Sequence, residues 1–238
     1  MFIPSAFVET DLIWLDRLLA RDAFVTLVTT GVDGLPQATR MPVLYRRDAD
    51  GILIEGHWAK PNPQAGHAGP ALMLVHGPHA YVSPGWYPDN AVRNGVGQPK
   101  AGPQGEPQGR GEHKEAQARV PTWNYAAAEL RGVLEPVTDD HALIAMLDGL
   151  SAHYEAQVGG DWDLLPIEPR QQRMLAGIVG FRFRPAQVQI KLKLKLSQNH
   201  PEANQSSVID ALSALDAPAS RELAQWMRWR REGGTAAD

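Results

Sequence analysis

Two basic residues stand close together in the first third of the chain, in a pattern that could bind a phosphate. Arg40 falls on an expected strand, and Lys60 follows the end of the next strand across a turn. In an antiparallel hairpin of this length, both side chains can reach one point near the rim of a barrel. A phosphate monoester carries close to two negative charges, which a guanidinium and an ammonium neutralise well. Beside them, His57, Trp58 and Asn62 could supply hydrogen-bond donors and a flat apolar wall for a ring system.

These residues also have simpler explanations. Two basic side chains near a turn most often form a solvated rim, and a tryptophan such as Trp58 is more often core than a stacking surface. Later in the chain, Trp123 and Tyr125 share one face of an expected strand with Asn124 on the other, which is typical of core packing.

The polar residues near position 195 have simpler explanations as well. Lys191, Lys193 and Lys195 fit a solvated strand face that discourages edge pairing. Gln198 and Asn199 can cap the helix that follows.

Other kinds of site have little support. The chain has no cysteine, and its eight histidines show no HxxxH or HxH spacing, so we expect no metal site. It has no GxSxG, no GxxxxGK[ST] and no GxGxxG that follows a strand, and we assign no catalytic residue.

Composition indicates an ordinary globular protein. Of 238 residues, 43% are hydrophobic and 21% are charged, which is typical of a folded domain. The net charge of -4 does not indicate nucleic acid or a membrane as a partner. The N-terminus has no basic stretch followed by an apolar one, and no apolar run is long enough to span a bilayer. We therefore expect a cytoplasmic protein without a membrane segment.

The order of elements predicts an α+β protein, with an antiparallel split β-barrel, surrounding helices and a helical C-terminal segment at 201–231. We expect one domain over 1–238. Expected strands are, in order, 24–30, 35–45, 52–57, the segment ALMLVHGPHAYVSP broken at Gly77–Pro78, 122–137, 177–183 and 188–196. Expected helices are one capped by Thr10 or Asp11, then 139–157, 168–175, 202–215 and 218–231.

Residues 94–111 read NGVGQPKAGPQGEPQGRG and keep no apolar period. Such a composition predicts a flexible insertion in the domain.

Four segments of the chain resemble the PaiB-type family of FMN-binding negative transcriptional regulators. They are MFIPSAFVETD at the N-terminus, GHWAKPNPQ at 56–64, GPHAYVSPGWYP at 77–88 with VPTWNYA at 120–126, and KLSQN at 195–199. The arginine strand followed by the lysine turn also resembles the phosphate-binding hairpin of pyridoxamine-phosphate-oxidase-like split barrels. Two departures stand out, since the connection before Val120 is longer than usual and no tryptophan follows Gln64.

The resemblance implies FMN bound non-covalently between the subunits of a homodimer, with the phosphate on Arg40 and Lys60. The residues that it implies for the cofactor site are Arg40, Met41, Pro42, Val43, His57, Trp58, Lys60, Asn62, Ser83, Trp86, Trp123, Asn124, Tyr125, Lys195, Ser197, Gln198 and Asn199.

The regulator name suggests DNA as a partner, for which the sequence gives limited support. Residues 180–231 hold nine Arg or Lys against four acids, a local balance of +5 that is compatible with a phosphate-binding face. The last two helices are joined by LDAP and do not form a helix-turn-helix. Trp226 and Trp229 form an apolar stripe that we expect to pack against the barrel.

Three functions remain open. The first is an FMN-binding regulator or sensor, and the second is a flavin-dependent oxidoreductase that acts on a small molecule. The third is an FMN-free barrel that serves as an interaction module. The phosphate pattern and the resemblance favour flavin binding over the third. Flavin chemistry needs no diagnostic side chain, so the sequence does not separate the first two.

Overall fold

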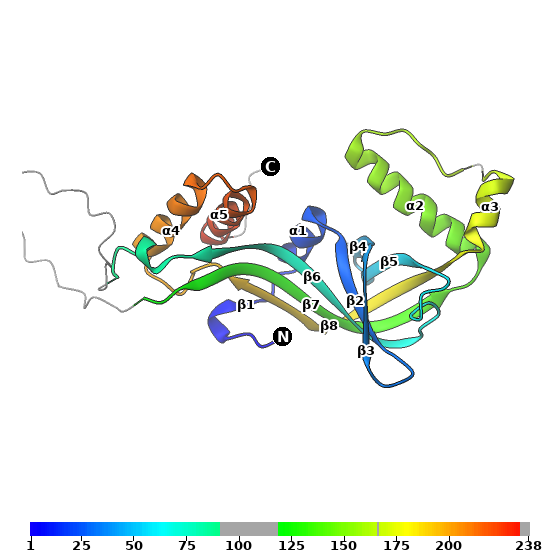
Figure 1. Ribbon diagram of the computed structural model, residues 1–238, viewed down its shortest axis with the longest axis horizontal. Coiled ribbons are helices and arrows are strands. Elements are labelled where there is room, and N and C mark those ends of the chain that lie inside the picture. The colour runs from blue at the N-terminus through cyan, green and yellow to red at the C-terminus, as the bar shows by residue number, and fades with distance from the viewer. Residues whose placement is uncertain (91–118, 166, 234–238) are drawn as a thin grey trace, which may run out of the picture. The chain divides into compact units, whose positions relative to one another are not determined.

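A computed structural model describes residues 1–90, 119–165 and 167–233 (Figure 1). Residues 94–111, expected to form a flexible insertion, lie outside the described residues. The helical elements are η1 (Ser5–Phe7), α1 (Ile13–Arg21), η2 (Pro84–Trp86), α2 (Asp140–Val158), α3 (Pro169–Leu175), α4 (Glu202–Ala214) and α5 (Pro218–Arg231). The strands are β1 (Val8–Glu9), β2 (Phe24–Thr30), β3 (Pro36–Pro42), β4 (Leu44–Asp48), β5 (Gly51–Ala59), β6 (Gly69–Val82), β7 (Thr122–Val137) and β8 (Ile178–Lys195).

The chain divides into two compact units. The first comprises Met1–Pro4, Val8–Gly77 and Ala127–Lys193. The second comprises Ser5–Phe7, Pro78–Ala126 and Leu194–Asp238. The chain passes from one to the other within β6, β7 and β8. The expectation of a single domain stays a prediction.

The strands form one sheet in the order β3-β2-β6-β7-β8-β5-β4, with β1 paired to β8. Pairing is antiparallel between β2 and β3, β2 and β6, β4 and β5, and β5 and β8. The two end strands of this order, β3 and β4, are consecutive in the chain with only Val43 between them. The sheet must therefore curl until its two edges approach each other, and the expected α+β split barrel is confirmed.

The break between β3 and β4 has a local cause. Pro42 has no N–H to give to a ladder, and the N–H of Val43 donates instead to the carbonyl of Ala23 at 3.1 Å. The expected return strand over 35–45 is therefore wrong as one strand. β6, in contrast, runs unbroken through Gly77 and Pro78, because the fixed φ of proline fits an extended chain even though it removes a donor.

Two aromatic rings lie side by side in the core of the first unit. Trp58 and Phe181 are almost fully buried, with ring centroids 5.3 Å apart. Gly56 makes room for this pair, since a Cβ there would lie 2.6 Å from Cζ of Phe181. A larger residue at position 56 would displace the ring.

Helix α2 packs on the outer side of β4 and β5 (Figure 1). Asp139 caps it by accepting from the N–H of Ala142 at 2.8 Å, and Gly159 ends it in the left-handed conformation. Its buried side chains, together with those of the strands below, form one cluster: Leu44, Val137, Leu143, Met146 and Leu150.

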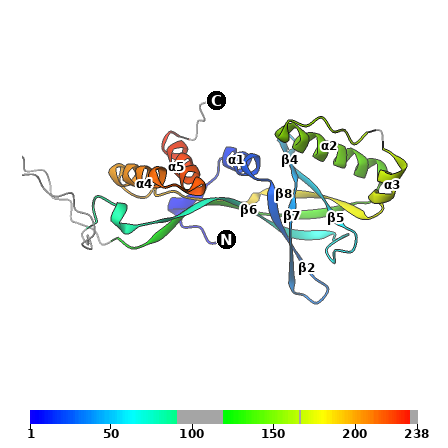
Figure 2. The same ribbon diagram turned by 45° about the horizontal axis from the view of Figure 1, so that its top comes forward.

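In the second unit, α4 and α5 lie against each other on one side of the strand ends (Figure 2). Trp226 and Met227 of α5 are buried, and Asn124 Nδ2 of β7 lies 3.6 Å from Met227 Sδ. Both C-terminal helices are confirmed. The alternation at the end of β8 is confirmed for Leu192 and Leu194, which are buried. Val188 is 92% exposed, so the expectation of one buried face over all of 188–196 is wrong at its first residue.

Candidate functional site

The residues expected to form the site fall in both units. Arg40 to Val43, His57, Trp58, Lys60 and Asn62 belong to the first. The second holds Ser83, Trp86, Trp123, Asn124, Tyr125, Lys195, Ser197, Gln198 and Asn199.

Arg40 and Lys60 do not share a hairpin. Arg40 lies on β3, which pairs with β2, whereas Lys60 follows β5, which pairs with β4 and β8. Four strands, β2, β6, β7 and β8, separate β3 from β5 in the sheet order. The expected hairpin is therefore wrong, because the break at Val43 sends β4 and β5 to the other end of the sheet.

The loop after β5 nevertheless returns to β3 through side-chain hydrogen bonds. Asn62 donates from Nδ2 to Oγ1 of Thr39 at 3.1 Å, and Thr39 donates to Oε1 of Gln64. Gln64 is 3% exposed and donates from Nε2 to Oγ1 of Thr29 and to the carbonyl of Gln37, both at 3.0 Å. Asn62 thus ties the loop to the residue next to Arg40. Sequence reasoning missed Gln64, although a glutamine behind two prolines in KPNPQ is the signal that could have shown it.

Arg40 and Lys60 are both exposed and lack acidic partners. The guanidinium of Arg40 lies 5.0 Å from the ring centroid of Phe24, and Lys60 Nζ lies 3.5 Å from the carbonyl of Ala176. No carboxylate in the described ranges lies within ion-pair distance of either one. By comparison, Arg46 and Arg182 both pair with Glu55. The charges of Arg40 and Lys60 are therefore available to an external anion.

His57 and Trp58, being neighbours on β5, point to opposite faces of the sheet. Trp58 points into the barrel, where its Nε1 is buried and has no hydrogen-bond partner among the described residues. His57 lies opposite Gly180 of β8, and burial lowers the pKa of its imidazole. The two side chains are not brought together on one wall. The expected site residues on and after β3 also differ in exposure, since Met41 and Val43 are buried whereas Pro42 is exposed.

The motifs VPTWNYA and KLSQN meet in the second unit. Asn124, which is 1% exposed, donates from Nδ2 to Oγ of Ser197 at 2.8 Å. Ser197 has a φ of 63°, a left-handed conformation that is uncommon outside glycine. Lys195 donates to Oγ1 of Thr122 and to the carbonyl of Trp123. These bonds fix the end of β8 against the start of β7.

On the face opposite Asn124, the neighbouring strands β6 and β7 carry exposed aromatic rings. Trp123 is 51% exposed and Tyr81 is 45% exposed, and their ring centroids are 6.4 Å apart. The ring of His79 lies 5.6 Å from that of Trp123. Core packing, the simpler explanation for Trp123, is therefore wrong. Tyr125 is half-buried.

The other expected residues of this unit have local roles. Gln198 accepts from the N–H of Leu196 at 2.8 Å and donates to the carbonyl of Ala6 at 3.0 Å, so it does not cap α4. Asn199 is exposed. Ser83 accepts from the N–H of Gly85 at 3.2 Å at the start of η2, and Trp86 is half-buried.

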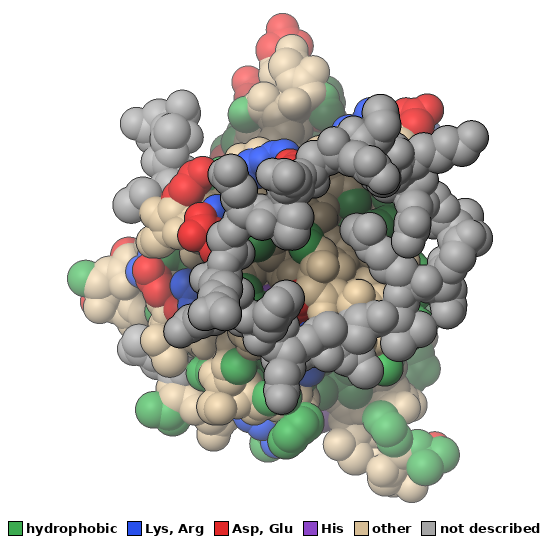
Figure 3. All heavy atoms as spheres, turned by 90° about the vertical axis from the view of Figure 1, so that its left-hand side faces the viewer, with side chains coloured by type: hydrophobic (Ala, Val, Ile, Leu, Met, Phe, Trp, Pro, Cys, Tyr) green, Lys and Arg blue, Asp and Glu red, His purple; other side chains and the backbone are tan. Residues whose placement is uncertain are grey.

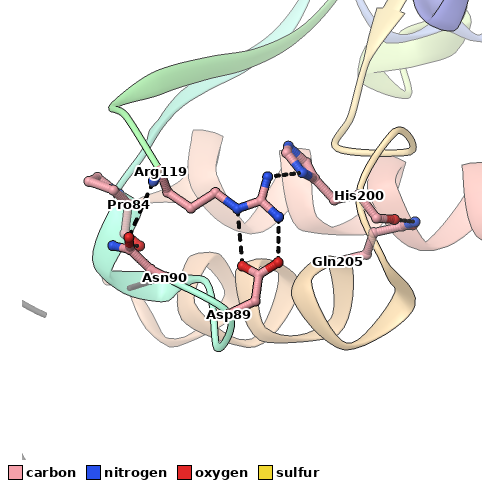
Figure 4. A network of polar contacts seen from close by, with 6 residues as sticks. All are labelled: Pro84, Asp89, Asn90, Arg119, His200 and Gln205. Atoms are coloured by element: carbon pink, nitrogen blue, oxygen red, sulfur yellow. Dashed lines mark hydrogen bonds and ion pairs between the residues drawn. The ribbon is translucent and has the colours of Figure 1, made fainter. Parts of the chain in front are cut away.

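A polar network that sequence reasoning missed surrounds Arg119 (Figure 4). Arg119 pairs with both oxygens of Asp89 and donates to Nδ1 of His200 at 3.0 Å. The bond from Arg119 lowers the pKa of Asp89, whereas burial and then the Arg119 charge lower that of His200. The ring of buried Tyr87 lies 5.0 Å from that of His200. A histidine beside a proline gave no signal of this arrangement.

The sequence model of a family described as "Putative FMN-binding domain" matches residues 1–97 and 106–187. The chain belongs to this family. It is 29% identical over 233 residues to the protease synthase and sporulation protein PAI 2 of Bacillus subtilis, covering 95% of this chain and 96% of that protein. The resemblance to the PaiB-type family is thereby confirmed, and FMN is the cofactor that family membership assigns.

One solved structure supports the fold, and a second is a weaker likeness that does not bear on it. A protein from Bacteroides thetaiotaomicron named for 5-nitroimidazole antibiotic resistance is 13% identical, with a TM-score of 0.50 over 78% of this chain and 85% of that one. The FAD and heme binding protein of Mycobacterium smegmatis is 18% identical, with a TM-score of 0.45 over 79% and 73%. Among the helices that the structure describes, none is long and apolar enough to cross a membrane. The described His, Asp and Glu residues form no cluster that could hold a metal ion.

Proposed function

We propose that this protein binds FMN through a phosphate site at Arg40 and Lys60 and acts as a PaiB-type regulator. The observation that carries the proposal is the pair of exposed cations without carboxylate partners in the first unit. The loop that carries Lys60 is held beside β3 by the bond from Asn62 to Thr39, whose side chain lies on the opposite face of the strand from that of Arg40. A forked guanidinium beside an ammonium matches the charge and geometry of a phosphate monoester.

The rest of the expected set would contact the ribityl chain and the ring. Bound FMN would supply the redox chemistry, and the chain would supply orientation and shielding from water. The exposed rings of Tyr81 and Trp123 are suited to a flat heterocycle, since offset aromatic rings attract beyond the area that they bury. Lys195, Ser197, Gln198 and Asn199 stand on the neighbouring strand end and the turn that follows.

We propose further that two copies of the chain share each flavin site. Large aromatic side chains at 45% and 51% exposure form a patch of the kind that soluble proteins usually cover with a partner. A homodimer in which one copy supplies the phosphate site and the other supplies the aromatic face is consistent with this exposure.

Regulation would be exerted through the flavin state and not through a large basic DNA-binding face. Several cations of the C-terminal region are neutralised within the chain, including Arg182 by Glu55, Lys191 by Glu129 and Arg231 by Glu202. On the face that Figure 3 presents, Lys and Arg side chains lie beside Asp and Glu. A protein partner whose affinity follows the flavin state would suit this mixed surface better than a DNA duplex.

The test compares FMN with riboflavin, which lacks the phosphate. Binding of each is measured by quenching of flavin fluorescence, with the parent, Arg40→Ala, Lys60→Ala and Arg184→Ala. Arg184 is an exposed control in the same unit. We expect Arg40→Ala to weaken FMN binding about tenfold or more, since a charge-assisted contact contributes roughly 1.5–3 kcal/mol. Lys60→Ala should weaken it less, and riboflavin binding should change little.

Equal FMN binding by the parent and both variants would show that the phosphate lies elsewhere. The oxidoreductase alternative is tested with the same holoprotein under oxygen with NADH or NADPH. Turnover well above that of free FMN would replace the regulator proposal with that alternative.

A further inference from the structure

A cavity of about 720 Å³ lies in the second unit, between α4, α5 and the end of β8. This volume is in the range of small-molecule sites, and the space between packed helices is a common place for them. Every residue that lines it lies beyond position 187, where the match to the FMN-binding family ends. One lining residue, Gln198, also belongs to the set expected to bind FMN, whereas the other lining residues do not.

The floor of the cavity is apolar. Leu196, Ile209 and Met227 line it and are themselves 2%, 3% and 1% exposed. Leu196 directly follows β8, Ile209 belongs to α4 and Met227 to α5, so the floor is built where the end of the strand meets both helices. An apolar group placed there would lose its contact with water over its whole lower side.

One pair of charges on the wall is already neutralised. Arg231 donates to Oε1 of Glu202 at 2.8 Å and to Oγ of Ser206 at 3.0 Å. These bonds join α5 to the first half of α4 and leave neither charge free for a ligand.

A second pair of opposite charges is not neutralised in this way. Arg228 donates to two uncharged acceptors, Oγ of Ser213 at 2.7 Å and Oε1 of Gln225 at 3.5 Å. Asp210 is exposed on α4. Within the described ranges, neither Arg228 nor Asp210 has an oppositely charged partner at ion-pair distance.

These two charges stand close together along α4. Asp210 and Ser213 are three residues apart on one helix, so their Cβ atoms are about 5–6 Å apart. Because Arg228 reaches Ser213, its guanidinium lies about one helical turn from Asp210. A cation and an anion over an apolar floor match a ligand with both charges and an apolar body.

We propose that this cavity binds a small zwitterion with apolar side groups, of about the size of a dipeptide. Its carboxylate would bind Arg228, its ammonium would bind Asp210, and its side chains would lie over the small exposed parts of Leu196, Ile209 and Met227. A simple anion would be attracted by Arg228 but repelled by Asp210. A simple cation would be attracted by Asp210 but repelled by Arg228. The charged lining as a whole is balanced, with Arg228, Arg230 and Arg231 against Glu202, Asp210 and Glu232.

The test is calorimetric titration of the full-length parent protein, saturated with FMN, with three probes. Leucyl-leucine carries both charges, N-acetyl-leucyl-leucine lacks the ammonium, and leucyl-leucinamide lacks the carboxylate. We expect one site for leucyl-leucine and at least about tenfold weaker binding of each blocked peptide. Because all three probes use the parent protein, a misfolded variant cannot affect this result.

Variants then locate the site. Arg228→Gln and Asp210→Asn should each weaken leucyl-leucine at least about fivefold. The matched controls are Arg221→Gln and Asp216→Asn, an exposed ion pair of the same unit outside the cavity, and they should bind like the parent. No binding of leucyl-leucine by the parent, equal binding of a blocked peptide, or unchanged binding by both cavity variants would each overturn the proposal. None of these results depends on where FMN binds.

Discussion

Asn124 donates a 2.8 Å hydrogen bond from Nδ2 to Oγ of Ser197, a residue 73 positions further along the chain. The bond is buried, and Ser197 holds a left-handed backbone conformation that a serine adopts only when its surroundings enforce it. The amide of Asn124 thus fixes the turn at which the chain leaves β8 and enters the C-terminal helices.

We expect Asn124→Ala to lower the free energy of unfolding by about 2 kcal/mol, because it leaves the hydroxyl of Ser197 without its buried amide donor. Urea unfolding at neutral pH measures this. Asn199→Ala, at an exposed position two residues beyond Ser197, is the control and should stay within about 0.5 kcal/mol. An unchanged midpoint for Asn124→Ala would mean that the bond does not hold this turn.

The pKa of His200, lowered by burial and by Arg119, predicts a loss of stability in acid. Below about pH 6.5 the unfolded chain takes up a proton at His200 that the folded chain does not, so the free energy of unfolding falls as pH falls. The fall continues until the pH reaches the folded pKa, with a slope of at most about 1.4 kcal/mol per pH unit.

His200→Gln should reduce that slope, measured as urea unfolding at pH 5 to 7. His141→Gln, an exposed histidine on α2, is the control and should keep the parent's slope. A parent slope retained in His200→Gln would assign the acid sensitivity to another group, such as His57, whose pKa burial also lowers.

Glu55 is 2% exposed and binds Arg46 of β4 and, at 3.0 Å, Arg182 of β8. Its carboxylate therefore joins the two strands that flank β5. We expect Glu55→Ala to cost about 2 kcal/mol of stability, less than for a fully buried pair, because both arginines are partly exposed and can regain water. Thermal or urea unfolding measures the change. Arg184→Ala, which breaks no described ion pair, should have little effect.

Excising most of residues 94–111 should change stability by less than about 1 kcal/mol, since loop-closure entropy grows only with the logarithm of length. The residues that join the two ends, Asp89, Asn90 and Arg119, would remain. Urea unfolding and FMN titration check this. Limited proteolysis with and without FMN tests the rival role, because protection by FMN would identify the segment as a lid.

The shared-site proposal predicts a dimer. Light scattering at micromolar concentration should give a mass near twice 26.1 kDa. A Trp123→Ser variant should shift the equilibrium towards monomer and weaken FMN binding together, since both would use the same face. A monomeric parent that binds FMN tightly would contradict the proposal.

Sequence periodicity was sufficient for the fold class and for most helices and strands. Alternation of leucine with lysine predicted the buried side of β8 at Leu192 and Leu194, and the helical period predicted α2, α4 and α5. Pairing was less accessible, because a strand's pattern shows which face is buried but not which strand lies beside it. The break between β3 and β4 follows Pro42, a residue type that could have indicated it. The hydrogen bond from Val43 to Ala23 could not be read from the sequence.

The candidate site was predictable to a similar degree. The resemblance named both Asn124 and Ser197, which the structure brings together. The contacts of the loop after β5 were missed, because Gln64 forms hydrogen bonds with residues of β2 and β3, which lie more than twenty positions earlier in the sequence. The network of Arg119 was missed for the same reason. Such contacts depend on tertiary placement, which short motifs do not encode.

The position of β8 in the sheet has a consequence for how the protein is made. β8 is the last strand in the chain, yet it lies between β7 and β5 and is what links the β4–β5 hairpin to the other strands. On the ribosome, that hairpin emerges more than a hundred residues before its neighbour. The edge of β5 that pairs with β8 must stay without its partner strand until Ile178–Lys195 has been synthesised. This makes the nascent chain a candidate for chaperone binding. A product that stops before residue 178 would have no way to complete the barrel.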